Sequence, residues 1–234
     1  MRGSTAGLAA WQRNSFIDFP GTVSTVLFYS GCNLRCPYCH NPAIALGQLH
    51  EAPPEAEIRS FLEKRAGDIG GVVFSGGEPS LHDSIPALAA DIRKLGYRIK
   101  LDTNGLRPEF IARLAPDYLA VDLKTDPASY RTLLQSPYED TQERLVRSLD
   151  AVRSMGAQAE VRVTAAPGIV DETAVERMAG MVAGVARVIL QPLRTRTALL
   201  SPEFNGVRPF TADRMARLRD ILATSCVECV IRGA

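Results

Sequence analysis

The sequence is poor in net charge, in cysteine and in long apolar runs, and each shortage excludes a class of protein. Its 27 lysines and arginines nearly balance its 26 aspartates and glutamates, so the formal charge of +1 gives no sign of nucleic-acid binding. Five cysteines in 234 residues are too few for a disulfide scaffold. No apolar run is long enough to span a bilayer, and residues 1–15 lack the apolar core of a signal peptide. We therefore expect a cytoplasmic, reduced and soluble protein that contacts neither nucleic acid nor membrane.

The rest of the composition is that of a globular chain, with 46% apolar and 23% charged residues. Short apolar runs alternate with segments of helical period, and continuous runs are typical of parallel strands buried on both faces. The predicted strands are 22–29, 71–74, 97–101, 118–123, 159–164 and 187–190, with a last possible strand at 226–231. Six βα units predict an α/β fold, a partial (β/α)6 TIM-like barrel open on one side, and a doubly wound open sheet is the second choice.

Three segments are expected along the chain. Residues 1–14 form an N-terminal tail, residues 15–191 form the barrel, and residues 192–234 form a C-terminal loop, helix and strand that pack on it. The irregular stretch 192–209 carries Arg194 and Arg196. Its length and charge predict a lid or a loop that faces a partner.

Three of the five cysteines, Cys32, Cys36 and Cys39, lie on one short loop after the first predicted strand. Three thiolates this close can bind one metal centre, and thiolates favour zinc or iron–sulfur clusters. A structural zinc site normally has four protein ligands, and the adjacent His40 could supply the fourth only with poor geometry. The spacing therefore favours a [4Fe–4S] cluster with one open iron, and a zinc-stabilised binding module is the alternative from another class.

Glycine and polar residues also gather at the ends of the next three strands, where α/β enzymes build their active sites. The sequences at these ends are Gly76-Gly77-Glu78-Pro79, Asp102-Thr103-Asn104-Gly105 and Asp122-Leu123-Lys124. Each sequence also has a structural explanation when taken alone. Gly76–Pro79 could form an ordinary tight turn, Asp102 could cap a helix, and Lys124 could extend its ammonium to solvent. Their common position at one rim of the predicted sheet favours a functional site.

The cysteine spacing, the aromatic Tyr38 before the last cysteine and the Gly-Gly-Glu-Pro turn together resemble the radical S-adenosylmethionine (SAM) superfamily. Further segments at 15–21, 39–42, 101–105 and 121–124 are similar to the activating enzymes of glycyl-radical enzymes. Within these, the sequence most resembles the activating proteins of anaerobic ribonucleoside-triphosphate reductase, with pyruvate formate-lyase activating enzymes next. The resemblance covers roughly residues 13–191.

The resemblance implies an iron–sulfur oxidoreductase with one [4Fe–4S] cluster on Cys32, Cys36 and Cys39, whose open iron binds SAM. An external one-electron donor of the flavodoxin or ferredoxin type would reduce the cluster. SAM would then be cleaved to a 5′-deoxyadenosyl radical, which generates a glycyl radical on a partner enzyme. In such chemistry the protein binds and orients the cofactors and excludes water from them. No catalytic acid–base pair is therefore expected.

The same resemblance places SAM beside the Gly-Gly-Glu-Pro turn. The backbone carbonyls of Gly76 and Gly77 are expected to accept hydrogen bonds from the SAM amino group. Glu78 and Pro79 are expected to shape the turn.

The remaining cofactor contacts are expected on the first cysteine loop and on the third and fourth strands. Asp102, with Thr103 and Asn104 alongside, is expected to accept hydrogen bonds from SAM amino or ribose groups. Lys124 is expected near the SAM carboxylate and Tyr38 beside the adenine. Two weaker candidates for the ribose or carboxylate lie on later strands: Arg162 and Gln191.

Two further interpretations concern the substrate and the last two cysteines. The deazaguanine-forming synthases have the same small barrel, so a radical SAM enzyme acting on a small molecule or a peptide is an alternative to an activating enzyme. Cys226 and Cys229 lie in an apolar run, where residues three apart face opposite sides of a strand. We therefore expect structural, buried cysteines there rather than a redox pair.

Overall fold

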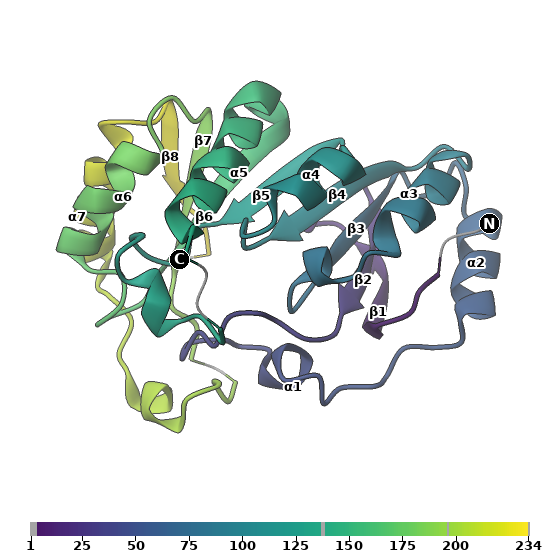
Figure 1. The fold of residues 1–234 in the computed structure, drawn as a ribbon, viewed down its shortest axis with the longest axis horizontal. Helices are drawn as coiled ribbons and strands as arrows, with labels where there is room; N and C mark the ends of the chain where they lie inside the picture. Colours follow the sequence, from purple (N-terminus) through teal and green to yellow (C-terminus); the bar gives the residue numbers. More distant parts are fainter. Residues whose placement is uncertain (1–3, 137–138, 196, 234) are drawn as a thin grey trace. The chain divides into compact units, whose positions relative to one another are not determined.

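The computed structural model describes residues 4–136, 139–195 and 197–233, in which strands and helices alternate along the chain (Figure 1). The strands follow one another in one sheet in chain order: β1 Leu8–Ser15, β2 Ser24–Tyr29, β3 Gly71–Gly76, β4 Arg98–Thr103, β5 Tyr118–Asp122, β6 Ala159–Ala165, β7 Arg187–Pro192 and β8 Glu228–Ile231. Strand β1 is antiparallel to β2, whereas the pairs β2–β3, β3–β4, β6–β7 and β7–β8 are parallel. The sheet is mostly parallel and not closed, which confirms the predicted open α/β architecture.

The helices connect these strands: α1 Pro42–Ala45, α2 Glu55–Lys64, α3 Ile85–Arg93, α4 Pro108–Leu114, α5 Thr141–Met155, α6 Glu172–Met181 and α7 Ala212–Ala223. Four short 3₁₀ turns complete the described structure: η1 Pro79–Leu81, η2 Tyr130–Thr132, η3 Gly156–Gln158 and η4 Pro202–Gly206. Within the described residues, no helix combines the length and the apolar composition needed to cross a membrane.

The chain forms two compact units. Unit 1 consists of Met1–Cys32, Ala43–Thr103 and Glu109–Leu119, and unit 2 of Asn33–Pro42, Asn104–Pro108 and Ala120–Ala234. The first unit therefore carries strands β1–β4, and the second carries β6–β8.

The core of unit 1 forms where apolar side chains of β2 and β3 meet two aromatic rings. Val26 and Val73 pack with Phe19 and Tyr118, whose ring centroids are 5.9 Å apart. Helix α3 buries an apolar stripe at spacings of three and four residues: Ile85, Leu88, Ala89 and Ile92. Burial of each large aliphatic side chain contributes about 1.5–3 kcal/mol, so this stripe fixes α3 onto its unit.

In unit 2, the periodicity of the sequence predicts a helix around residues 139–155 with Leu145, Leu149 and Val152 as its inner stripe, and α5 has this stripe. Leu145, Leu149 and Val152 are all fully buried. The next helix, α6, begins where the Asp171 carboxylate accepts a hydrogen bond from the backbone N–H of Ala174 at 2.9 Å. Side-chain capping and one apolar face thus explain why these segments form helices at the predicted places.

The prediction of a tail at residues 1–14 is wrong for residues 8–14, which belong to β1. This strand pairs with β2, and its register shifts between Gln12 and Ser15. Ala9 is buried, while Gln12 and Arg13 face solvent. An edge strand with a register shift and four consecutive polar residues has no clear alternation of apolar and polar positions, which is why its sequence was not distinctive.

Cys226 and Cys229 also differ from expectation, because β8 begins at Glu228 and Cys226 precedes it. Both cysteines are half-buried rather than buried. Burial raises the pKa of both thiols, that of Cys229 to about 12, and the two side chains interact with each other. The argument from opposite strand faces therefore fails, although the raised pKa values still disfavour reactive thiolates.

The long irregular segment after β7 is confirmed and contains η4. Arg194 is exposed, while Arg196, the other arginine expected in this loop, lies outside the described residues.

A charged residue at Ala9 tests whether β1 belongs to the folded core. Ala9→Asp should lower the free energy of unfolding by about 3 kcal/mol or more, because it buries an unpaired carboxylate. Gln12→Asp, at an exposed position of the same strand, should change it by no more than about 0.5 kcal/mol. Urea unfolding of both variants measures this, and equal small effects would mean that residues 8–15 behave as a tail.

Candidate active site

The end of β3 approaches the backbone of β2 so closely that only glycine fits. A Cβ at Gly76, where φ is +121°, would lie 2.4 Å from the backbone nitrogen and oxygen of Tyr29. A Cβ at Gly77 would lie 2.0 Å from the carbonyl oxygen of Gly31. The N–H of Gly77 donates to the Tyr29 carbonyl at 2.9 Å, and that of Glu78 donates to the Gly31 carbonyl at 2.8 Å. The turn therefore fixes the backbone directly before Cys32.

The side chain of Glu78 joins the ends of β3 and β4. It is 1% exposed and accepts hydrogen bonds from the Ser80 N–H at 3.0 Å and the Thr103 hydroxyl at 2.7 Å. Pro79 opens η1 directly after it. The hydrogen bond between Glu78 and Thr103 thus stabilises the turn.

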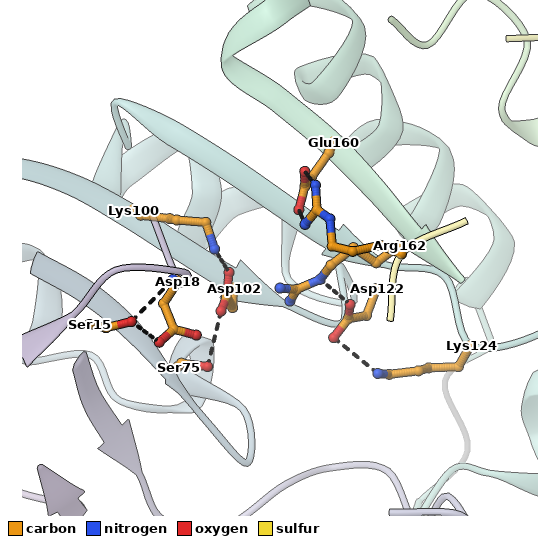
Figure 2. Close-up of polar contacts among 10 residues, drawn as sticks. Ser15, Asp18, Ser75, Lys100, Asp102, Asp122, Lys124, Glu160 and Arg162 are labelled. Carbon is orange, nitrogen blue, oxygen red and sulfur yellow. Dashed lines mark hydrogen bonds and ion pairs between the residues drawn. The ribbon is translucent and has the colours of Figure 1, made fainter. Parts of the chain in front are cut away.

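Asp102 is held by two donors from unit 1, as Figure 2 shows. The Lys100 ammonium forms an ion pair with its Oδ1, and the Ser75 hydroxyl donates to its Oδ2 at 3.1 Å. The Lys100 side chain is only 2% exposed, and its Nζ lies 5.8 Å from the centre of the Tyr118 ring. Sequence reasoning missed Lys100, although a lysine inside the apolar run 97–101 was a signal. These contacts fix the orientation of the Asp102 carboxylate.

The segment 15–21 lies elsewhere in unit 1, between β1 and β2. The Ser15 hydroxyl contacts the Asp18 carboxylate and accepts the N–H of Ile17 at 3.3 Å. This turn precedes the amino end of β2, whereas Cys32 follows its carboxyl end. The structure therefore places the segment and Cys32 at opposite ends of β2.

In unit 2, the first part of the cysteine loop is anchored through Asn33. The Asn104 side-chain amide donates to the Asn33 side-chain oxygen at 2.7 Å, and the Gln135 N–H donates to the Asn33 carbonyl at 3.0 Å. The Arg35 N–H donates to the Leu133 carbonyl at 2.6 Å. Asn104 is thus engaged by the loop itself, a role that sequence reasoning did not assign.

Cys36 and Cys39 lie in the same unit, close to Tyr38 and Lys124. Burial raises the pKa of the Cys36 thiol to about 11, although the nearby Lys124 and a hydrogen bond with Tyr38 oppose this rise. The Tyr38 hydroxyl donates to the Lys124 carbonyl at 3.1 Å, and its ring is almost fully buried. A thiol of this kind becomes a thiolate when a metal binds it.

Beside Cys36, one carboxylate is shared by two cations (Figure 2). Lys124 Nζ lies 3.0 Å from Asp122 Oδ2, and Arg162 Nε lies 2.7 Å from Asp122 Oδ1. Burial opposes ionisation of Asp122, but the two cations hold its pKa well below its usual range. Burial likewise disfavours the Lys124 ammonium, but the Asp122 carboxylate raises its pKa. The Asp122 carboxylate thus fixes the positions of two cationic side chains.

Arg162, a weaker candidate from the sequence, therefore binds the same Asp122 carboxylate as Lys124. The other weak candidate, Gln191, lies on β7 in register with Thr164 of β6.

The donor set fits a cluster better than a single ion. A zinc ion draws all its ligands to one centre, whereas cysteines of an iron–sulfur cluster bind separate irons. Three thiols on one loop, with no fourth cysteine beside them in the sequence, suit such a cluster.

Comparison with known proteins assigns the family. The model of the radical SAM superfamily matches residues 26–179, about two thirds of the chain. The chain belongs to the radical SAM superfamily. Its cofactors are therefore a [4Fe–4S] cluster and SAM, and the chain is a radical SAM enzyme.

Curated relatives differ in what they act on. A Methanocaldococcus jannaschii protein described as a glycyl-radical enzyme activating enzyme is 33% identical over 172 residues, 70% of each chain. The 7-carboxy-7-deazaguanine synthase of Thermococcus kodakarensis is 26% identical over 215 residues, 81% of this chain and 78% of the relative.

Solved structures share the fold of this chain. Streptococcus suis SuiB bound to its precursor peptide has a TM-score of 0.62 at 14% identity, over 89% of this chain and 48% of that one. TYW1 with a lysine–pyruvate adduct has a TM-score of 0.60 at 16% identity, over 86% of this chain and 73% of that one. These similarities support the open, partial-barrel architecture.

The close approach at Gly77 predicts a large effect of one methyl group. Gly77→Ala should lower the free energy of unfolding by about 2 kcal/mol or more, because the added Cβ meets rigid backbone. It should also reduce the iron bound per chain, because the backbone before Cys32 must move.

Gly180→Ala is the matched control, since Gly180 lies in α6 and a Cβ there meets nothing within 4 Å. It should leave iron content unchanged and stabilise the fold by about 0.5–1 kcal/mol. Thermal unfolding and iron analysis measure both effects. A Gly77→Ala variant as stable and iron-rich as the wild type would contradict the packing described here.

Proposed function

We propose that this radical SAM enzyme generates a glycyl radical on a partner enzyme, and that the partner is an anaerobic ribonucleoside-triphosphate reductase. The main support is the 33% identity to the Methanocaldococcus jannaschii activating enzyme, which extends over 70% of both chains. The segments 15–21, 39–42, 101–105 and 121–124 resemble the same group of enzymes. The substrate would accordingly be a glycine of a large protein.

In this proposal Cys32, Cys36 and Cys39 hold the cluster, which when bound supplies the electron that cleaves SAM. The chain itself orients the cofactors. The fixed turn at Gly77 sets the backbone before Cys32, and Asn33 fixes the backbone that follows it. A loop held in this way needs little rearrangement when the cluster binds.

SAM would be held through its charged amino-acid group. The carbonyls of Gly76 and Gly77 and the Asp102 carboxylate would accept hydrogen bonds from its amino group. Lys124 and Arg162 would bind its carboxylate through charge-assisted hydrogen bonds.

Other residues expected at SAM have contacts that favour a supporting role. The Thr103 hydroxyl is bound to Glu78, and the Asn104 amide is bound to Asn33. Tyr38 is 6% exposed, and its hydroxyl is bound to the Lys124 carbonyl. We assign these three side chains to holding the rim and the loop.

The reductant would be an external one-electron donor of the flavodoxin or ferredoxin type. Beyond the three loop cysteines the sequence has only Cys226 and Cys229. Two cysteines fall short of the four that usually hold a further iron–sulfur cluster.

A radical SAM enzyme acting on a small molecule is the second candidate. The 7-carboxy-7-deazaguanine synthase relative, which aligns with 81% of this chain, favours it specifically. The two candidates differ in whether the substrate is a protein.

Anaerobic activation of a partner tests the proposed function. Reconstituted protein, SAM, a reductant and an anaerobic ribonucleoside-triphosphate reductase should give 5′-deoxyadenosine and a glycyl-radical signal in electron paramagnetic resonance. A reductase with the radical glycine replaced by alanine should give no such signal. SAM cleavage without a radical on the reductase or on pyruvate formate-lyase would reject the activating role and favour the second candidate.

The role proposed for Lys124 predicts a selective loss of SAM affinity. Lys124→Gln should raise the Kd of SAM about 10- to 100-fold, because a charge-assisted hydrogen bond contributes about 1.5–3 kcal/mol. Asp122 keeps Arg162 as its partner, so the fold should be preserved.

Lys94→Gln is the control, because the Lys94 side chain is 74% exposed and its ion-pair partner Asp91 belongs to α3 rather than to the proposed SAM site. It should leave the Kd unchanged. Equilibrium binding to the cluster-loaded protein measures both variants. Equal affinities for Lys124→Gln and the wild type would remove Lys124 from the SAM site.

A further inference from the structure

The segment Leu199–Asn205, here called the strap, lies against the second half of the cysteine loop. It comes from the long irregular stretch after β7 and includes most of η4, in the yellow-green part of the chain in Figure 1. The N–H of Leu200 donates to the Cys39 carbonyl at 3.0 Å. The N–H of Ser201 donates to the Pro37 carbonyl, also at 3.0 Å. Two consecutive residues of the strap therefore bind the backbone on both sides of Tyr38.

The strap is itself fixed. The Asn205 side-chain oxygen accepts the N–H of Leu199 at 2.8 Å, which closes the segment on itself. Leu199 is 4% exposed, so its side chain anchors the segment in the core of unit 2. The centroid of the Phe204 ring lies 6.4 Å from the centroid of the Tyr38 ring. The strap and the cysteine loop are therefore joined by ring packing as well as by hydrogen bonds.

The cysteine loop needs such support because it has little regular structure of its own. Residues 35–40 form no helix or strand, and the turn from Cys36 to Cys39 is closed by one backbone hydrogen bond of 2.9 Å. An unsupported loop must lose conformational freedom when it binds a metal centre, and that loss weakens binding. Hydrogen bonds to the Pro37 and Cys39 carbonyls reduce the freedom of the loop beforehand.

We propose that the strap positions Cys39 for the iron–sulfur cluster, with Leu200, Ser201 and Phe204 as the positioning residues. The proposal rests on the proposed function only in taking Cys39 as a cluster ligand. It gives the irregular segment after β7 a role in holding the cofactor. The identity of the substrate does not affect it.

Proline at position 201 tests the backbone contact directly. Ser201→Pro removes the N–H that binds the Pro37 carbonyl, whereas Ser201→Ala keeps it. In the protein without its cluster, hydrogen exchange of a peptide covering residues 36–40 should become about tenfold faster in the proline variant only. In the loaded, full-length protein, the proline variant should lose its cluster faster in air and give an altered electron paramagnetic resonance spectrum with SAM.

Phe204→Ala provides a second test if the proline variant does not unfold cooperatively. Its control is Phe210→Ala, since Phe210 packs on Arg214 outside the strap. Phe204→Ala should increase exchange at residues 36–40 and the rate of cluster loss, and Phe210→Ala should do neither.

The outcomes separate the strap from the ligand assignment. Wild-type exchange and wild-type cluster lifetime in both Ser201→Pro and Phe204→Ala would overturn the role of the strap. A Cys39→Ser variant that keeps a wild-type cluster would instead overturn the assignment of Cys39. Faster exchange without faster cluster loss would also reject the proposal, because the strap would then support the loop without serving the cluster.

Discussion

Backbone contacts fix the cysteine loop on each side of Cys32, and the geometry of the proposed cofactor site depends on them. Before it, the β3 turn leaves no room for a Cβ at Gly77 and binds the Gly31 carbonyl. After it, Asn33 is held by the Asn104 amide. A short loop has little secondary structure to hold its thiols, so tertiary contacts to its backbone do so.

Charged side chains at the ends of β4 and β5 are paired with one another. Lys100 and Asp102 form one such pair in unit 1. In unit 2, the Asp122 carboxylate at the end of β5 is shared by Lys124 and Arg162. Burying unpaired charges would be costly, whereas paired and oriented charges can bind a charged ligand with little reorganisation. SAM carries both an amino group and a carboxylate, so both kinds of partner are useful.

The sequence predicted those features that have a strong local pattern. The continuous strands, the inner stripe of α5 and the cysteine loop were all recognisable from periodicity or spacing. Strand β1 was missed because its polar residues and register shift hide the alternation. Lys100 was missed because it stands in an apolar run, although its ion-pair partner Asp102 lies two residues further along the same strand and therefore on the same face. The contact of the strap with the Cys39 carbonyl joins residues 161 positions apart, which no local pattern could show.

The central claim is that the cysteine loop holds a cluster whose open iron binds the amino-acid group of SAM. Electron–nuclear double resonance on the reduced protein, with SAM labelled with ¹⁵N in its amino group and ¹⁷O in its carboxylate, tests it most directly. The account predicts hyperfine coupling of both labels to the cluster, and no such coupling once Cys36 is replaced by serine. A cluster that forms normally but shows no coupling to either label would contradict it.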